Sequence, residues 1–315
     1  MTDELYGELS IISTKGNEDF ARQVDDWIRQ WRSEEAVALA QKEKVGADAT
    51  LFDTDIHVDS FVASADTIRF ADGEGKCVLH ESMRGHDVYI LCDLFNYGVT
   101  YKMYGVEQRM SPDDHYQDLK RIIGAIGGKA RRTSDELVMF SPDEGGMARC
   151  VYYSSILGLD LSMFYKRRDY TRVVNGKNPI VAHEYLGGDI RGKDVIVVDD
   201  IIASGESMMD VARKIREMGA RRVFLFASFG LFCEGLEKID EAYENGYFDY
   251  LFTTNLVYRS PELLSRKWFV EVNLTKYVAL LIDTLNHDRS ISRLLSNAEK
   301  ITNLQQAHMK HTEQN

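Results

Sequence analysis

The sequence has few prolines and cysteines, no long apolar run and no excess of positive charge. Only 4 of its 315 residues are proline, and no tract is so biased in composition that it would resist building a core. No uninterrupted apolar run approaches the ~20 residues that cross a bilayer. The first ten residues, MTDELYGELS, carry acids where a secretory signal needs positive charge. We therefore expect a folded cytoplasmic protein with no membrane partner.

The shortage of basic residues excludes a nucleic-acid surface. The chain holds 50 acidic and 38 basic side chains, a formal net charge of -12, whereas binding to a phosphate backbone requires a concentrated basic face. The cysteines are widely separated and form no CxxC pair, so we expect reduced thiols in the core of a cytosolic protein. They are Cys77, Cys92, Cys150 and Cys233.

The length of the chain predicts two domains, because 315 residues exceed the size that one hydrophobic core usually reaches. The first part begins with a strand at 7–13 and a helix at 17–43, whose apolar residues recur with helical period. Short apolar runs then predict strands at 60–63, 67–70, 76–79 and 88–92.

In the second part of the chain, strands alternate with helices. The predicted strands are 137–140, 161–165, 195–199 and 223–228. This alternation indicates an α/β fold with mainly parallel sheets flanked by helices, in which ligands bind at the carboxyl ends of the strands. We place the domains at 1–136 and 137–302, followed by a polar tail at 303–315.

Three helix starts share one pattern, in which a serine is followed by a proline and then by an acid. The serines are Ser111, Ser141 and Ser260. Serine caps exposed amides, proline presets the first turn, and a carboxylate suits the positive end of the helix. The first of these helices is predicted to run to residue 126, just before a glycine.

The run VIVVDDIIASGES at 195–207 carries the strongest signal for chemistry. A buried strand is followed by two acids and then by a loop of small residues that opens a helix. Successive amides of such a loop, together with the helix dipole, favour a phosphate, and we expect Gly205 to let the anion approach. The predicted phosphate loop consists of Ala203, Ser204, Gly205, Glu206 and Ser207.

Asp199 and Asp200 follow the apolar part of this strand, and we place them at its end. Two adjacent carboxylates suit the 2- and 3-hydroxyls of a ribose, or a Mg²⁺ ion held there. The alternative is a strand that ends in a solvated turn, since acid pairs and Ser/Gly loops are each common. The ordered combination of all these parts favours the ribose-phosphate interpretation.

The same thirteen residues resemble the signature of the type I phosphoribosyltransferase fold. Ala203 departs from many base-transferring members, which carry an acid at this position. That departure disfavours a nucleobase phosphoribosyltransferase, the third hypothesis for this chain.

Further segments resemble the ribose-phosphate pyrophosphokinase family. FADGE is similar to that family's ATP-binding loop, which implies that Phe70 stacks on adenine while Asp72 and Glu74 read its edge from a neighbouring subunit. ESMRG and SIS resemble segments of a regulatory phosphate site, implying that role for Ser82, Arg84, Ser290 and Ser292. Taken alone, FADGE would be an ordinary turn and Arg84 a solvated side chain.

Two more segments carry the resemblance into the second domain. SPDEGG is similar to a strand-to-helix turn that faces the ribose, which implies a substrate role for Asp143; composition alone would predict a capped helix start. KRR, directly after the predicted strand, contains Lys166 and Arg168. By resemblance, Lys166 stabilises the transferring phosphoryl group, although a basic triplet after a strand is more often simply solvated.

The resemblance implies two type I phosphoribosyltransferase-like domains, of which the first is truncated, as in a divergent bacterial subgroup. A stretch that would carry a mobile ATP loop and a metal-binding histidine is missing before SPDEGG. Arg131 and Arg132 are either a remnant of that ATP-binding loop or a basic turn. Of the histidines, His115 is expected to open a helix and His183 to lie in a long loop after KRR.

The implied activity is transfer of pyrophosphate from MgATP to ribose 5-phosphate, giving phosphoribosyl pyrophosphate and AMP for nucleotide biosynthesis. Asp199 and Asp200 would hold the metal. The implied partners are ATP, ribose 5-phosphate and further copies of the chain in a homo-oligomer. The alternative is a non-catalytic relative that binds ribose phosphate or nucleotide and regulates an active partner.

Overall fold

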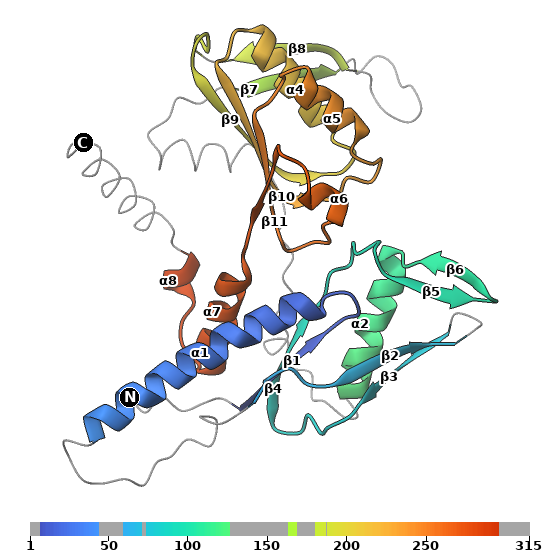
Figure 1. Ribbon diagram of the computed structural model, residues 1–315, viewed down its shortest axis with the longest axis vertical. Helices are drawn as coiled ribbons and strands as arrows, with labels where there is room; N and C mark the ends of the chain where they lie inside the picture. Colours follow the sequence, from blue (N-terminus) through green and yellow to red (C-terminus); the bar gives the residue numbers. More distant parts are fainter. Residues whose placement is uncertain are drawn as a thin grey trace. The chain divides into compact units, whose positions relative to one another are not determined.

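A computed structural model describes residues 7–43, 59–70, 74–126, 163–168, 180–186 and 188–295 (Figure 1). Contacts within the chain divide it into two compact units. The first consists of Met1–Ser141, Ser228–Cys233 and Phe252–Leu294, and the second of Pro142–Ala227, Glu234–Leu251 and Leu295–Asn315. The predicted domain boundaries at 136/137 and 302/303 lie outside the described residues.

The N-terminal part of the first unit combines one parallel strand pair, two antiparallel hairpins and two helices. Strands β1 and β4 are parallel, and β2–β3 and β5–β6 are antiparallel hairpins. The predicted strand at 60–63 is wrong, because only Val62 forms an isolated bridge there, to Ile11. The elements are β1 Glu8–Ser13, α1 Glu18–Glu43, β2 Ala65–Arg69, β3 Gly75–Leu79, β4 His86–Leu91, β5 Thr100–Met103, β6 Val106–Arg109 and α2 Pro112–Ile126.

Strand β1 is buried on both faces, as expected of a parallel strand between helices. Ile11 and Ile12 project to opposite faces and are both fully buried. Ile11 belongs to a cluster with Val24 and Ile28 of α1, whereas Ile12 packs in a cluster with Ile122 of α2. The apolar residues that recur with helical period in the sequence thus form the buried faces of α1 and α2.

Helix α7 (Thr275–Asn286) completes the core on the α1 side. It packs along α1 (Figure 1), and its Ala279 and Ile282 join the cluster around Ile11. Arg32 of α1 pairs with Asp283 at 3.1 Å and donates to Asn286 at 2.6 Å. Residues about 250 positions apart in the chain thus share one hydrophobic core.

Two of the three predicted serine caps lie in the described residues, and both are confirmed. The Ser111 hydroxyl accepts from the Asp114 amide at 3.2 Å, and the Asp114 carboxylate accepts from the Ser111 amide at 2.9 Å. This reciprocal pair is a capping box. Ser260 caps α6, accepting from the Leu263 amide at 3.1 Å.

A four-stranded sheet follows in the order β12-β11-β10-β9. The strands begin side by side: the Arg221 amide donates to the Lys193 carbonyl at 2.7 Å, and the Asp249 amide donates to the Val223 carbonyl at 2.8 Å. Neighbouring strands therefore run in the same direction, and the predicted α/β fold with parallel sheets is confirmed. Its elements are β9 Asp194–Ile202, α4 Glu206–Glu217, β10 Arg222–Gly230, α5 Glu237–Glu244, β11 Tyr250–Thr254, α6 Pro261–Leu264 and β12 Phe269–Val272.

Three further elements complete the described chain. Strands β7 (Met163–Arg168) and β8 (Ile180–Leu186) pair with each other in antiparallel orientation. A short helix, α8 (Ser292–Leu295), follows α7. No helix in the described part of the chain has the length and apolar character needed to span a bilayer.

The three described cysteines are free thiols in different environments. Cys77 and Cys92 are half-buried, whereas Cys233 is exposed, so the predicted core location is wrong for Cys233, which lies in the loop after β10. Burial raises the pKa of the Cys92 thiol to about 11 and also raises that of Cys77.

We predict that iodoacetamide alkylates Cys233 before the two half-buried thiols. The thiolate is the reactive species. At Cys92 and Cys77, a raised pKa lowers the fraction of thiolate, and partial burial limits the access of the reagent. Peptide mass spectrometry of a time course at neutral pH, repeated in denaturant, measures the order. Alkylation of Cys92 at the rate of Cys233 in the native protein would contradict the structure.

Candidate functional site

The predicted phosphate loop joins β9 to α4 in the second unit (Figure 1). Strand β9 ends at Ile202 and α4 begins at Glu206, so only Ala203, Ser204 and Gly205 lie between them. The strand, tight loop and helix start that the sequence predicts are therefore present. A ligand at the helix start would lie beyond the carboxyl end of a parallel strand, where α/β proteins bind ligands.

The acid pair lies within β9 rather than at its end, which corrects the prediction. The strand continues through Ile201 to Ile202, which is 2% exposed and anchors the strand in the core. Each carboxylate accepts a hydrogen bond from the next amide: Asp199 from Asp200 at 2.8 Å, and Asp200 from Ile201 at 2.9 Å. Since successive residues of a strand project to opposite faces, the two carboxylates do not share one face.

Gly205 is required for a different reason from the one that the sequence suggests. Its φ of 88° is a left-handed conformation that favours glycine. A Cβ at this position would lie 3.1 Å from Cδ1 of Ile239 in α5. The side of Gly205 that lacks a Cβ therefore faces Ile239 in the core. Glycine is needed here for the left-handed turn and for this close packing, rather than to let an anion approach.

The start of α4 has the features of an anion site. Gly205 is the N-cap and makes no side-chain capping hydrogen bond. The Ser204 hydroxyl lies 3.4 Å from the Glu206 amide, and the exposed Ser207 adds a hydroxyl to the first turn. Amides at the first turn of a helix point outward and the helix dipole favours negative charge, so this turn is suited to a phosphate group.

The basic triplet lies inside strand β7 and not after it, which is a second correction. Lys166 is the register partner of His183 in β8, and an irregularity in pairing falls between Arg167 and Arg168. His183 was expected in a loop, but it is part of β8. Strand β8 was missed because its short apolar run follows a long polar segment, and its pairing with β7 is a tertiary feature.

The other predicted site residues lie in different places. Phe70 is 46% exposed just after β2, and its amide donates to the Glu74 carbonyl at 2.7 Å, so these two residues of FADGE lie opposite each other beside the β2–β3 pair. Ser82 and Arg84 occupy an exposed turn in which the Arg84 amide lies 3.4 Å from the Ser82 hydroxyl. Asp72, Arg131, Arg132 and Asp143 lie outside the described residues.

The C-terminal serines form a small turn of their own. The Ser290 hydroxyl donates to that of Ser292 at 3.0 Å and accepts from the Ser292 amide at 3.3 Å. Within the part of the chain that the structure describes, no hydrogen bond joins these serines to Ser82 or Arg84. The predicted histidine opening α2, His115, is buried and its Nε2 lies 2.8 Å from the Asn96 carbonyl oxygen.

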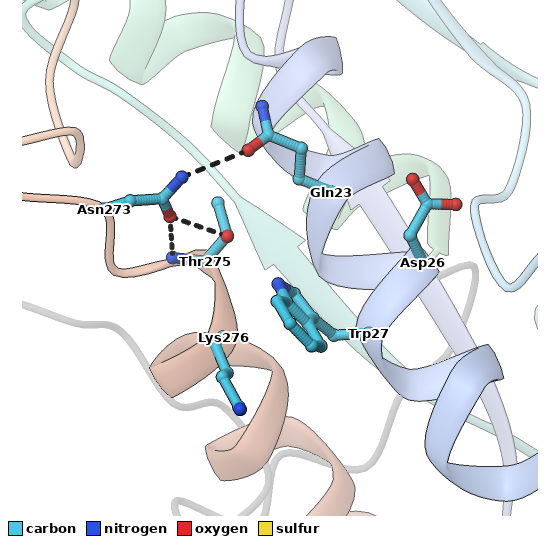
Figure 2. A pocket seen from close by; sticks show the side chains of 6 residues that line it. All are labelled: Gln23, Asp26, Trp27, Asn273, Thr275 and Lys276. Atoms are coloured by element: carbon cyan, nitrogen blue, oxygen red, sulfur yellow. Dashed lines mark hydrogen bonds between the residues drawn. The ribbon is translucent and has the colours of Figure 1, made fainter. Parts of the chain in front are cut away.

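A hollow of about 480 Å³ lies between α1 and the start of α7, and no motif predicted it (Figure 2). Asn273 donates to Gln23 at 3.4 Å and accepts from the amide and hydroxyl of Thr275. The Trp27 ring is contacted by the Lys276 ammonium at 4.7 Å and by Trp31 at 5.9 Å. Because the indole is already contacted, this hollow offers no open aromatic platform.

Comparisons with known proteins point to the same class as the loop geometry. Residues 113–245 match the phosphoribosyl transferase domain family. The chain is 30% identical over 169 residues to the ribose-phosphate pyrophosphokinase of Vibrio cholerae, covering 53% of this chain and 50% of that one. It is 32% identical over 163 residues to the enzyme of that name from Shewanella oneidensis, covering 51% and 49%. The chain spans about half the length of the curated relatives that it matches.

One solved structure supports the fold. The chain resembles the phosphoribosylpyrophosphate synthetase of Mycobacterium smegmatis with a TM-score of 0.53 and 15% identity, over 89% of this chain and 99% of that one. At this identity the likeness shows the fold alone.

The parallel sheet and the matched residues make the segment 113–245 similar to the phosphoribosyl transferase domain family. Over about half of its length, the chain is also similar to proteins named ribose-phosphate pyrophosphokinase.

Proposed function

We propose that the protein is a ribose-phosphate diphosphokinase that transfers pyrophosphate from ATP to ribose 5-phosphate. The observation that carries the proposal is the connection from β9 to α4. There, a helix start whose N-cap is Gly205, with a serine hydroxyl on either side of it, closely follows a strand that carries two acids, inside the segment that matches the phosphoribosyl transferase domain. The relatives named ribose-phosphate pyrophosphokinase support this choice of reaction.

In the proposed reaction, the anomeric hydroxyl of ribose 5-phosphate attacks the β-phosphorus of ATP. The bond from that phosphorus to the oxygen bridging to the α-phosphate breaks, AMP leaves, and the hydroxyl proton passes to water. Catalysis of this kind depends on positioning and charge neutralisation. We assign the 5-phosphate to Ser204–Ser207, the sugar hydroxyls to Asp199 and Asp200, and the transferred group to Lys166 and Arg168.

The acids also fit a magnesium ion. Mg²⁺ is usually held by one or two carboxylates together with substrate phosphates. Because Asp199 and Asp200 leave opposite faces of β9, one of the two carboxylates would hold the ion together with the substrate phosphates. The described residues contain no group of three or more His, Cys, Asp or Glu side chains that would hold a metal by themselves. When bound, the ion would neutralise charge on the transferred group.

The remaining roles extend the proposal to the first unit and to other subunits. We assign adenine to Phe70, Asp72 and Glu74, presented to a neighbouring copy in a cytoplasmic homo-oligomer, with Arg131 and Arg132 also contacting ATP and Asp143 facing the ribose. We assign a regulatory phosphate to Ser82, Arg84, Ser290 and Ser292. The exposure of Phe70 just after β2 supports a ring available for stacking.

A non-catalytic relative is the second candidate, favoured by one observation. The chain matches only about half of each curated relative, so similarity to those enzymes is detected over the matched segment and not over the rest of their length. Such a protein would bind phosphorylated ribose without turnover and would co-purify with an active synthetase.

The proposal predicts that the purified chain releases AMP from ATP only when ribose 5-phosphate and Mg²⁺ are present. Mass spectrometry of the mixture should show AMP and phosphoribosyl pyrophosphate in equal amounts. 2-Deoxyribose 5-phosphate is the matched control substrate, because it lacks one of the hydroxyls assigned to the acid pair and should react more slowly. Binding of ribose 5-phosphate without AMP would support the second candidate, and absence of both would reject the two together.

A further inference from the structure

A second hollow, of about 340 Å³, opens in the first unit between β2, β5 and α2. Its lining includes Lys15, Arg69 and Lys102, three cations in a chain whose net charge is -12. The volume is at the small end of the range of ligand pockets. Tyr101, Thr67 and Asp118 also contribute to the lining.

The floor of this hollow is a fixed network of charges. The side chain of Arg69 is only 10% exposed and pairs with Asp114 at 3.2 Å and Asp118 at 3.0 Å. Its guanidinium also lies 5.2 Å from the centre of the Tyr101 ring. Arg121 pairs with the same Asp118 at 2.6 Å. The positive charges of Arg69 and Arg121 are thus balanced by Asp114 and Asp118. The two lysines of the lining then supply the remaining positive charge.

Lys15 is presented by a well-defined turn. The Asn17 amide donates to the Thr14 carbonyl at 3.1 Å, and Asn96 donates to the Gly16 carbonyl at 3.0 Å. Gly16 has a φ of 85°, and a Cβ there would collide with Val99 and Asn96. The backbone on either side of Lys15 is therefore held in place, and a ligand would have to order only the lysine side chain.

Lys102 lies on β5, where its cross-strand partner is Glu107. That carboxylate accepts a hydrogen bond from Thr100 at 2.8 Å and forms no ion pair with Lys102. Within the described ranges, neither Lys102 nor Lys15 has a carboxylate within ion-pair distance. Two lysines without such a partner therefore line the same small hollow.

We propose that this hollow binds a small anion bearing a phosphate group, with Lys15 and Lys102 as its ligands. Like charges gathered in a cleft raise the local concentration of an anion, and a phosphate oxygen bound by an ammonium makes a charge-assisted hydrogen bond. The paired arginines beneath it keep the floor rigid and add no net charge. The residues of this hollow belong to the first unit, whereas the phosphate loop of the proposed reaction belongs to the second.

The test is lysine acetylation of the full chain with and without pyrophosphate, read peptide by peptide by mass spectrometry. Pyrophosphate should slow acetylation of Lys15 and Lys102 and leave Lys76, an exposed lysine on β3 outside the hollow, unchanged. Sodium chloride at equal ionic strength is the control for screening. Orthophosphate in a parallel arm shows whether one phosphate group is enough.

Variants give the second measurement. In each variant, we measure the pyrophosphate concentration that halves the acetylation rate of the pocket lysine that remains. Lys15→Gln and Lys102→Gln should each raise it by about tenfold, since each removes one charge-assisted hydrogen bond. Lys76→Gln, with the same loss of charge on the neighbouring hairpin, should leave it unchanged. Equal slowing at Lys76, or no slowing at either pocket lysine, would overturn the proposal. Because the readout is local to the first unit, it does not depend on whether the protein releases AMP.

Discussion

Lys166→Ala is expected to lower the rate of AMP release by about 10² to 10³, the effect of losing one preorganised charge at the transferring group. The effect should appear in kcat with little change in the KM for ribose 5-phosphate, because we assign that substrate to the β9–α4 connection. Lys166 lies on β7, paired in register with His183 of β8. Initial rates at varied ATP and ribose 5-phosphate separate the two parameters.

Lys193→Ala is the matched control for this variant. Lys193 is exposed in the same unit, just before β9, and its backbone carbonyl accepts from the Arg221 amide, a bond that alanine retains. The control should keep close to the parent rate, and Lys166→Arg should recover part of the activity by restoring the charge. A parent-like rate for Lys166→Ala would remove the lysine from the mechanism, while a rise in KM alone would assign it to substrate binding.

The candidate site shows which features of a motif can be predicted from neighbouring residues alone. The loop from Ala203 and the helix start at Glu206 follow from local chemistry, because small residues and a left-handed glycine suffice to define the turn. The extent of β9 could not be read in this way, because charged residues interrupt the apolar pattern at Asp199. Burial of Ile202 keeps the strand intact beyond the acids, and this burial depends on tertiary packing.

The same distinction explains which helices and strands were predicted from the sequence and which were missed. Helices α1 and α2 were predicted well because apolar period and serine caps are properties of neighbouring residues. The β5–β6 hairpin was missed, since its turn places Tyr104 and Gly105 at φ values of 49° and 81°. A hairpin turn of this kind usually signals itself with Asn-Gly or Asp-Gly, and tyrosine at a positive φ gives no such signal. Strand β8 was missed as well, although it pairs with the preceding strand β7, because a long, mostly polar segment separates the two strands in the sequence.

Asp25→Ala is expected to destabilise the first unit by about 3 kcal/mol, in the range for removing one partner of a buried ionic network. Asp25 is 3% exposed on α1. Its carboxylate accepts from the Phe61 amide at 2.8 Å, the Ser60 hydroxyl at 2.9 Å and the Arg29 guanidinium at 2.9 Å. Alanine would leave the Phe61 amide without this acceptor and would remove two hydrogen bonds between α1 and residues 59–64.

Asp26→Ala is the control that shows how much of the stability loss is due to the burial of Asp25. Asp26 is the next residue on α1 and contacts the same arginine, but its side chain is 66% exposed. Exposed ion pairs contribute about 0–1 kcal/mol, so this variant should unfold close to the parent in urea, monitored by tryptophan fluorescence. Phe61 also bonds to β1 through its carbonyl, which accepts from the Ile11 amide at 2.7 Å, so loss of Asp25 should loosen the segment beside β1 first. Equal midpoints for the two variants would mean that Asp25 does not anchor this segment, and that the hydrogen bonds to β1 and the packing of Phe61 hold it to the core.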